Sequence, residues 1–182
     1  MKNTAFARST SSTGMPKIGE AGSVTAAGQT WQMNKGDVLY LGMGSGAVTF
    51  SGMGRFYITS CPAHRELPCR LVTVDEAKEM KTGAVETSNK RTIRQFIHHL
   101  VMESCQLVLG YTTLEDGSVW NTMPAHVHDR RMEAYLYHGM TPEEETHFRA
   151  RQRSRNKVLA LVLLFCFAYY RGLGIVVVAS LG

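Results

Sequence analysis

The chain has 182 residues, of which 44% are hydrophobic and 19% are charged. This is the composition of a globular protein with a buried core, and it excludes a chain that is disordered throughout. The formal net charge of +5 comes from the C-terminal end: residues 1–148 hold 14 basic and 15 acidic side chains, whereas residues 149–182 hold six basic and no acidic ones. Because the body of the chain is close to neutral, we do not expect a nucleic-acid partner.

The N-terminal end and the cysteines indicate a cytoplasmic protein. Residues 1–20 are rich in Ser, Thr and Gly and contain no apolar stretch that resembles a signal peptide. We expect these residues to form a disordered lead-in. None of the four cysteines forms a CxxC pair, and they are too sparse for a disulfide framework, so we expect free thiols in a reducing compartment: Cys61, Cys69, Cys105 and Cys166.

Residues 21–72 have the texture of antiparallel β structure. Short β-branched and aromatic runs alternate with glycine and asparagine, which predicts strands joined by tight turns. We expect the turns at Gly28 and at 34–36. The expected strand positions are Val24, Trp31, Val38–Leu41, Val48–Phe50 and Phe56–Ile58.

Residues 73–100 are expected to form a helix and a connector. The helix is predicted over 73–80, with Thr73 as its N-cap and Glu76 three residues later as the capping-box partner. The connector "ETSNKRTIRQFIHHLV" follows and ends near the pair His98–His99, which we interpret as solvated.

Residues 101–147 return to the pattern of strands. The segment "CQLVLGYTTLEDGSVWNTM" predicts a hairpin around the turn at 115–118. "EAYLYHGM", residues 133–140, predicts a further strand with Ala134, Leu136 and His138 on one face.

The tail, residues 148–182, is basic at first and then apolar. Five basic residues alternate through 149–157, and an unbroken apolar run covers 158–170. The segment 158–181 is long enough for a membrane helix, but Arg171 near its centre would cost roughly 2.5–3.5 kcal/mol on insertion scales. A pair of buried strands is the alternative interpretation, and membrane attachment is not our expectation.

The segment "PAHVHDRRMEAYLYHGM" (124–140) contains the residues with the clearest chemistry. On a strand, His126 and His128 project from the same face, so their imidazoles can meet one cation. Glu133 lies five residues later and reaches that cation only if the chain turns or bulges between them. Two histidines and a carboxylate are a ligand set for a divalent first-row metal, zinc or iron. The alternative is three polar residues on the surface of a sheet.

The spacing HxHx4E is similar to the first metal motif of the cupin superfamily. The stretch "SCQLVLGYTTLEDGSVWNTMPAHVHDRRMEAYLY" (104–137) more closely resembles the 5-keto-4-deoxyuronate isomerases, also called 4-deoxy-L-threo-5-hexosulose-uronate ketol-isomerases. "FYITSCPAHRELP" (56–68) and "TSNKRTIRQFI" (87–97) resemble upstream segments of that family. The similarity covers roughly residues 18–146.

The resemblance implies an all-β fold of two tandem cupins, which are β-sandwich barrels. Residues 21–72 would belong to the N-terminal cupin and 101–147 to the C-terminal one, with both halves incomplete. It also implies homo-oligomers, hexamers in particular, and one zinc per chain held by His126, His128 and Glu133. The implied reaction converts 5-dehydro-4-deoxy-D-glucuronate to 3-deoxy-D-glycero-2,5-hexodiulosonate in pectin and uronate breakdown.

The sequence departs from the family pattern in two places. The family's fourth zinc ligand is a histidine some tens of residues after the glutamate, and neither His138 nor His147 lies in its context. The tail 148–182 resembles no part of the family. A shortened or frame-shifted copy would have this texture, and a remnant that binds metal weakly without turnover is the alternative to an active isomerase.

Residues for the proton transfer and for the substrate carboxylate remain candidates only. No catalytic residue is assigned, although His64, Asp129 and Tyr135 are candidate bases whose alternative role is structural. Arg130 and Arg131 adjoin the metal motif and have the planar guanidinium that suits a carboxylate. A solvated turn or a salt bridge between subunits is the alternative for these arginines.

Overall fold

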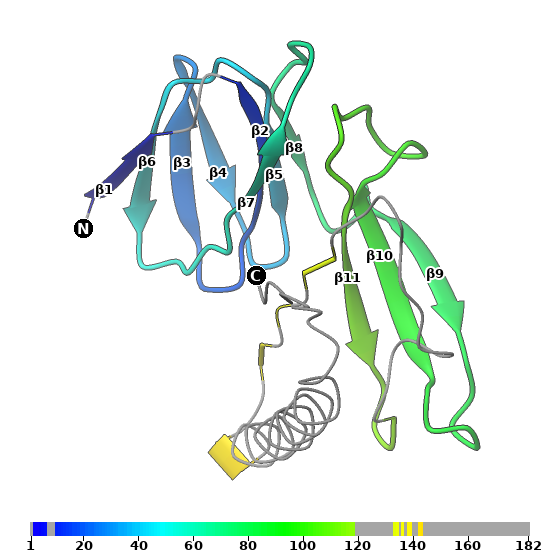
Figure 1. The fold of residues 1–182 in the computed structure, drawn as a ribbon. Helices are drawn as coiled ribbons and strands as arrows, with labels where there is room; N and C mark the ends of the chain where they lie inside the picture. Colours follow the sequence, from blue (N-terminus) through cyan, green and yellow to red (C-terminus); the bar gives the residue numbers. More distant parts are fainter. Residues whose placement is uncertain are drawn as a thin grey trace, which may run out of the picture. The chain divides into compact units, whose positions relative to one another are not determined.

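The computed structural model describes the backbone of residues 2–6, all of residues 10–118, and the single positions 133, 134, 136, 138, 139, 142 and 143. The chain divides into two compact units, Met1–Arg130 and Arg131–Gly182. The described part of the first unit contains eleven strands, and all of their pairings are antiparallel (Figure 1). In the second unit, Pro142 and Glu143 are helical.

The strands form three sheets, in each of which spatial neighbours are hydrogen-bonded. The first sheet has the spatial order β1 (Lys2–Phe6), β6 (Ala47–Gly52), β3 (Gly22–Ala26) and β4 (Gln29–Met33). The second has the order β7 (Thr59–Pro62), β2 (Ser11–Pro16), β5 (Val38–Leu41) and β8 (Arg70–Val72). The third has the order β11 (Leu109–Leu114), β10 (Arg91–Ile97) and β9 (Lys78–Thr82).

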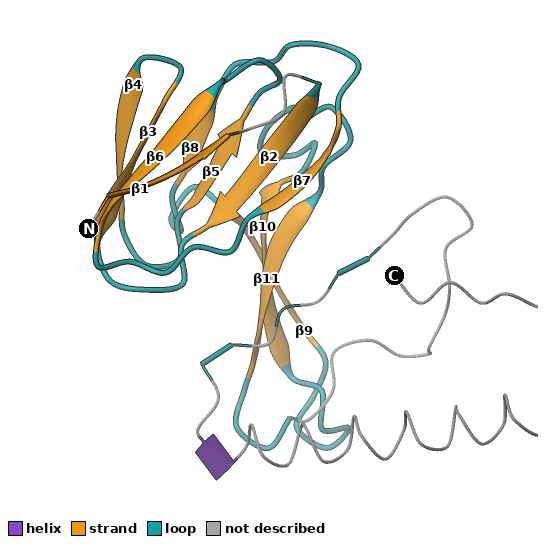
Figure 2. Ribbon diagram, turned by 60° about the vertical axis from the view of Figure 1, so that its left-hand side comes forward, coloured by secondary structure: helices purple, strands orange, loops and turns teal. Residues whose placement is uncertain are grey.

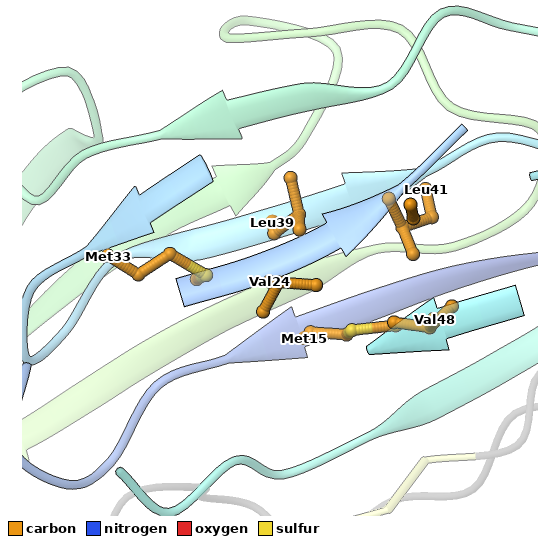
Figure 3. Packing of buried hydrophobic residues seen from close by; sticks show 7 residues of the cluster. Met15, Val24, Met33, Leu39, Leu41 and Val48 are labelled. Atoms are coloured by element: carbon orange, nitrogen blue, oxygen red, sulfur yellow. The ribbon is translucent and has the colours of Figure 1, made fainter. Parts of the chain in front are cut away.

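The first two sheets form a β-sandwich, and Figure 2 shows them as facing layers. Their inner faces meet in one apolar cluster, part of which is drawn in Figure 3: Met15, Val24, Ala26, Met33, Leu39, Leu41 and Val48. The prediction of an all-β protein of the cupin and β-sandwich type is therefore confirmed. Among the strands that the structure describes, no pairing closes the two sheets into a barrel.

Strand β5 is buried on both faces because the second sheet is the middle layer. Leu39 and Leu41 face the sandwich core, while Val38 and Tyr40 belong to a second cluster with Phe96 of β10. An uninterrupted apolar run is what a strand between two layers requires. Close approach of the third sheet depends on Gly14 of β2, since a Cβ there would lie 2.8 Å from Leu107 Cδ2 and 2.9 Å from Ile97 Cδ1.

The two predicted tight turns are confirmed. Ala27 and Gly28 join β3 to β4 with φ values of 49° and 73°, the left-handed pair that a two-residue hairpin turn uses. In the second turn, Asp37 N–H donates to Asn34 C=O at 3.2 Å, and Gly36 has a φ of 93°. The strand predicted over 56–58 is displaced: Phe56 makes only an isolated bridge, to Lys17, and β7 begins at Thr59.

The prediction of a disordered lead-in over residues 1–20 is wrong. Ser11–Pro16 forms β2, which pairs with β5 on one side and with β7 on the other. Ser12 and Thr13 are buried in this strand. Their small polar side chains indicated exposure when considered alone, but a strand crowded from both layers accommodates small side chains better than large ones.

The helix predicted over 73–80 and the connector after it are also wrong. The capping contacts do form, because Thr73 N–H donates to Glu76 Oε2 at 2.9 Å and Glu76 N–H donates to Thr73 C=O at 3.2 Å. The N–H bond lowers the pKa of Glu76. These contacts close a single turn, and Lys78–Thr82 then pairs with the predicted connector as β9 on β10. Tertiary ladder bonds thus override a local helix signal.

Lys17 is buried in the first unit without a hydrogen-bond partner for its ammonium group among the described residues. Nζ lies 4.5 Å from the centroid of the Phe56 ring, a cation–π contact. A Cβ on Gly54 would come within 1.9 Å of Nζ, so that glycine makes room for the lysine. Burial lowers the pKa of Lys17, while the charges of Glu20 and Asp37 oppose the shift.

We expect Lys17→Met to stabilise the fold by about 1 kcal/mol at neutral pH, because it removes a desolvated charge and retains an unbranched side chain. The lowered pKa means that the folded protein binds fewer protons than the unfolded chain between that pKa and 10.5, so wild-type stability rises with pH across this window. The variant should lack that rise. Urea unfolding at several pH values measures both effects, with exposed Lys35→Met as the control; destabilisation by Lys17→Met would refute the prediction.

Candidate functional site

The predicted metal motif lies mostly outside the described residues. His126 and His128, both arginines at 130 and 131, and the candidate bases Asp129 and Tyr135 are all in that part of the chain. Glu133 is described, and it is exposed. Within the described ranges, no three His, Cys, Asp or Glu side chains gather closely enough to hold a metal ion.

The segment that precedes the motif is held by a strand and a turn. β11 pairs with β10, and the predicted turn at 115–118 is confirmed because Ser118 N–H donates to Glu115 C=O at 2.9 Å. Glu115 is anchored to the chain before β10 by an ion pair with Lys90 at 3.0 Å. The second strand of this predicted hairpin lies outside the described residues.

The prediction of a strand over 133–140 is wrong at the positions that the structure describes. Glu133, Ala134, Leu136 and His138 belong to no strand, and all four are exposed. Alternate side chains of a half-buried strand should face a core. Here residues of both parities are exposed, and Leu136 retains 43% of its surface, so no buried sheet face forms at these positions.

His64, the described candidate base, contacts a cysteine. Its Nδ1 lies 3.1 Å from Cys105 Sγ, and its main-chain N–H donates to the same sulfur at 3.1 Å. His64 is exposed, whereas Cys105 is buried. The loop after β7 thus meets the loop before β11, and an ion pair between Arg65 and Glu103 joins the same two loops.

A shallow depression of about 320 Å³ lies elsewhere in the first unit, lined by Ala27, Met43, Gly44, Ser45, Glu66, Leu67, Pro68 and Cys69. Ser45 Oγ donates to Gly42 C=O at 2.5 Å and lies 3.3 Å from Cys69 Sγ. Because the serine proton is engaged by the carbonyl, the Cys69 thiol is the donor in its contact with Ser45. The thiol in this depression is therefore a hydrogen-bond donor to a hydroxyl group and not a nucleophile paired with a base.

Neither of these thiol contacts was anticipated from sequence. His64 and Cys105 are 41 positions apart, and Ser45 and Cys69 are 24 apart. Chemical motifs are found by short, regular spacing, and these pairs have none. Only the pairing of strands into layers brings them together.

The layered antiparallel strands define the class of the protein as a β-sandwich of the cupin type. The model of the KduI/IolB family matches residues 14–169, and the chain belongs to that family. The match includes the whole metal motif. It also reaches beyond residue 146, so the prediction that nothing after 147 is family-like is wrong as far as residue 169.

The chain is similar to curated ketol-isomerases over about half their length. A 4-deoxy-L-threo-5-hexosulose-uronate ketol-isomerase from Agrobacterium fabrum is 72% identical over 127 residues, which cover 70% of this chain and 46% of that protein. Proteins of the same name from Cereibacter sphaeroides (strain ATCC 17029) and Shouchella clausii are 61% and 46% identical, over 74% and 78% of this chain and 50% and 54% of their own lengths.

Among solved structures, an IolB-like protein from Salmonella typhimurium LT2 is 16% identical, with a TM-score of 0.49 over 56% of this chain and 43% of its own. That likeness is too weak to define the fold. In the part of the chain that the structure describes, no helix is both long enough and apolar enough to cross a bilayer. The apolar segment 158–181 lies outside it.

Proposed function

We propose that this chain belongs to a zinc-dependent ketol-isomerase that converts 5-dehydro-4-deoxy-D-glucuronate to 3-deoxy-D-glycero-2,5-hexodiulosonate in uronate and pectin breakdown. The observation that supports it most is the 72% identity to a named ketol-isomerase, together with a family match that includes the whole metal motif. Fold alone would not support a reaction, because one fold serves many functions.

The donor set of the motif fits zinc. Two imidazole nitrogens and one carboxylate oxygen, from His126, His128 and Glu133, leave a position open for substrate, as catalytic zinc sites do. The exposed Glu133 is not committed to a core. When bound, zinc would act as a Lewis acid that polarises a carbonyl group.

The remaining parts of the reaction would fall to neighbouring side chains. An aldose–ketose isomerisation moves one proton between adjacent carbons, which requires a base positioned near the substrate. Arg130 and Arg131 adjoin the metal motif in sequence and could bind the substrate carboxylate through paired N–H donors. His64 is engaged through Nδ1 with Cys105, which leaves Nε2 as its remaining titratable nitrogen.

We expect purified protein to contain one zinc per chain and to consume the uronate substrate. His126→Ala should weaken zinc binding by at least about 100-fold, since even outer-shell changes reduce metal affinity 10–100-fold, and turnover should fall with it. Elemental analysis and a substrate-consumption assay on the same folded preparation measure both quantities. His99→Ala is the matched control, because His99 is an exposed histidine outside the motif.

The outcomes separate the alternatives. Stoichiometric zinc without turnover would support a metal-binding remnant, and stoichiometric iron would favour an oxygenase-type site. A folded protein without any transition metal would refute the proposal. We further propose a cytoplasmic homo-oligomer, a hexamer in particular, with no nucleic-acid or membrane partner; light scattering of the metal-loaded protein measures the oligomeric state.

A further inference from the structure

Cys105 and His64 form a pair of nucleophile and base in the first unit. The His64 main-chain N–H donates to Cys105 Sγ at 3.1 Å, and Nδ1 lies 3.1 Å from the same sulfur. Because the sulfur already accepts one hydrogen bond from the main chain, the thiol proton is placed between Sγ and Nδ1. Such contact between a thiol and a base is the arrangement that activates a cysteine.

The other described cysteines have no base beside them. Cys61 Sγ lies 3.6 Å from Ser12 Oγ, and Cys69 Sγ lies 3.3 Å from Ser45 Oγ. A hydroxyl group does not remove a proton from a thiol at neutral pH. Among the cysteines that the structure describes, Cys105 therefore stands alone in having an imidazole as partner.

The pair is held in position by its surroundings. The ion pair between Arg65 and Glu103 joins the residue after His64 to a residue two positions before Cys105. Ser104 Oγ donates to Leu107 C=O at 2.5 Å, which orders the loop around the cysteine. Cys105 is 6% exposed and adjoins an exposed imidazole, so a reagent that reaches the sulfur must be small.

We propose that Cys105 is a modification site for small hydroperoxides and that His64 is the positioning base. The sulfur attacks one peroxide oxygen, so an S–O bond forms as the O–O bond breaks. The thiol proton passes through Nδ1 to the leaving oxygen, which departs as water or an alcohol. Sulfur loses two electrons, the peroxide gains them, and Cys105 becomes a sulfenic acid.

The test is the rate of oxidation of each cysteine in the folded, full-length chain at pH 7. After brief exposure to hydrogen peroxide, sulfenic acid is trapped with a dimedone reagent and quantified per peptide by mass spectrometry. We expect Cys105 to react at least about 10-fold faster than Cys61 and Cys69, and His64→Gln to reduce that rate by about 100-fold, the low end of general-base catalysis. Gln retains the main-chain donor but is not a base.

Two controls keep the result interpretable. His99→Gln changes an exposed histidine that contacts no described thiol and should leave every rate unchanged. Cys105→Ser should abolish the fast-reacting peptide. If His64→Gln fails to fold, as judged by circular dichroism, the comparison of the three thiols in the wild-type protein decides. Cys105 reacting no faster than Cys61, or unchanged in folded His64→Gln, would overturn the proposal, and neither result depends on isomerase activity.

Discussion

Phe96→Ala is expected to reduce the free energy of unfolding by about 3–5 kcal/mol, the range for removing a large buried side chain. Phe96 has no exposed surface and lies in the cluster that joins the third sheet to the middle layer. Its ring packs edge-on against Tyr111, with centroids 4.9 Å apart and planes at 63°. Alanine would leave a cavity between two sheets whose backbones are fixed by ladder hydrogen bonds, so little collapse can fill it.

Urea unfolding followed by fluorescence measures this loss, and Val108→Ala is the matched control. Val108 is 66% exposed, so its truncation should change stability by no more than about 0.5 kcal/mol. The result bears on the proposed site, because β11 leads into the segment with the metal motif. A loss below about 1 kcal/mol would show that the third sheet does not depend on this contact.

The strand pattern of residues 21–52 was predictable because local sequence and tertiary packing agree there. Gly28 supplies the left-handed backbone of a hairpin turn, and Val38–Leu41 is apolar throughout because both faces of β5 are buried. Such segments obey the same rule at each level of structure. Their boundaries consequently match the prediction closely.

The failures have a common physical cause, which is packing that local sequence does not show. Ser12 and Thr13 are buried because β2 lies between two other strands, although small polar residues indicate exposure by composition. Thr73 and Glu76 make the hydrogen bonds of a capping box without a helix after them. For the candidate site, a short motif named the metal ligands, while the contact of His64 with Cys105 depends on two distant loops.

Gly42→Ala should destabilise the protein by at least about 3 kcal/mol, because overpacking against main chain cannot be relieved by a rotamer change. Gly42 is buried at the end of β5, and a Cβ there would lie 1.8 Å from Leu67 O and 3.0 Å from Leu67 C. Its own carbonyl accepts the Ser45 hydroxyl at 2.5 Å, so moving Gly42 away from Leu67 would disturb that bond as well.

The matched control is Gly46→Ala in the same loop. Gly46 has a φ of +71° and open space around the position of a Cβ, so alanine there adds backbone strain of about 1–2 kcal/mol and no collision. Thermal unfolding of both variants should give the larger loss for Gly42. Equal losses would mean that the main chain at Leu67 yields, and that the loop lining the depression is not fixed by contact with the end of β5. A much larger loss at Gly42 would instead show that close backbone approach sets the position of that loop.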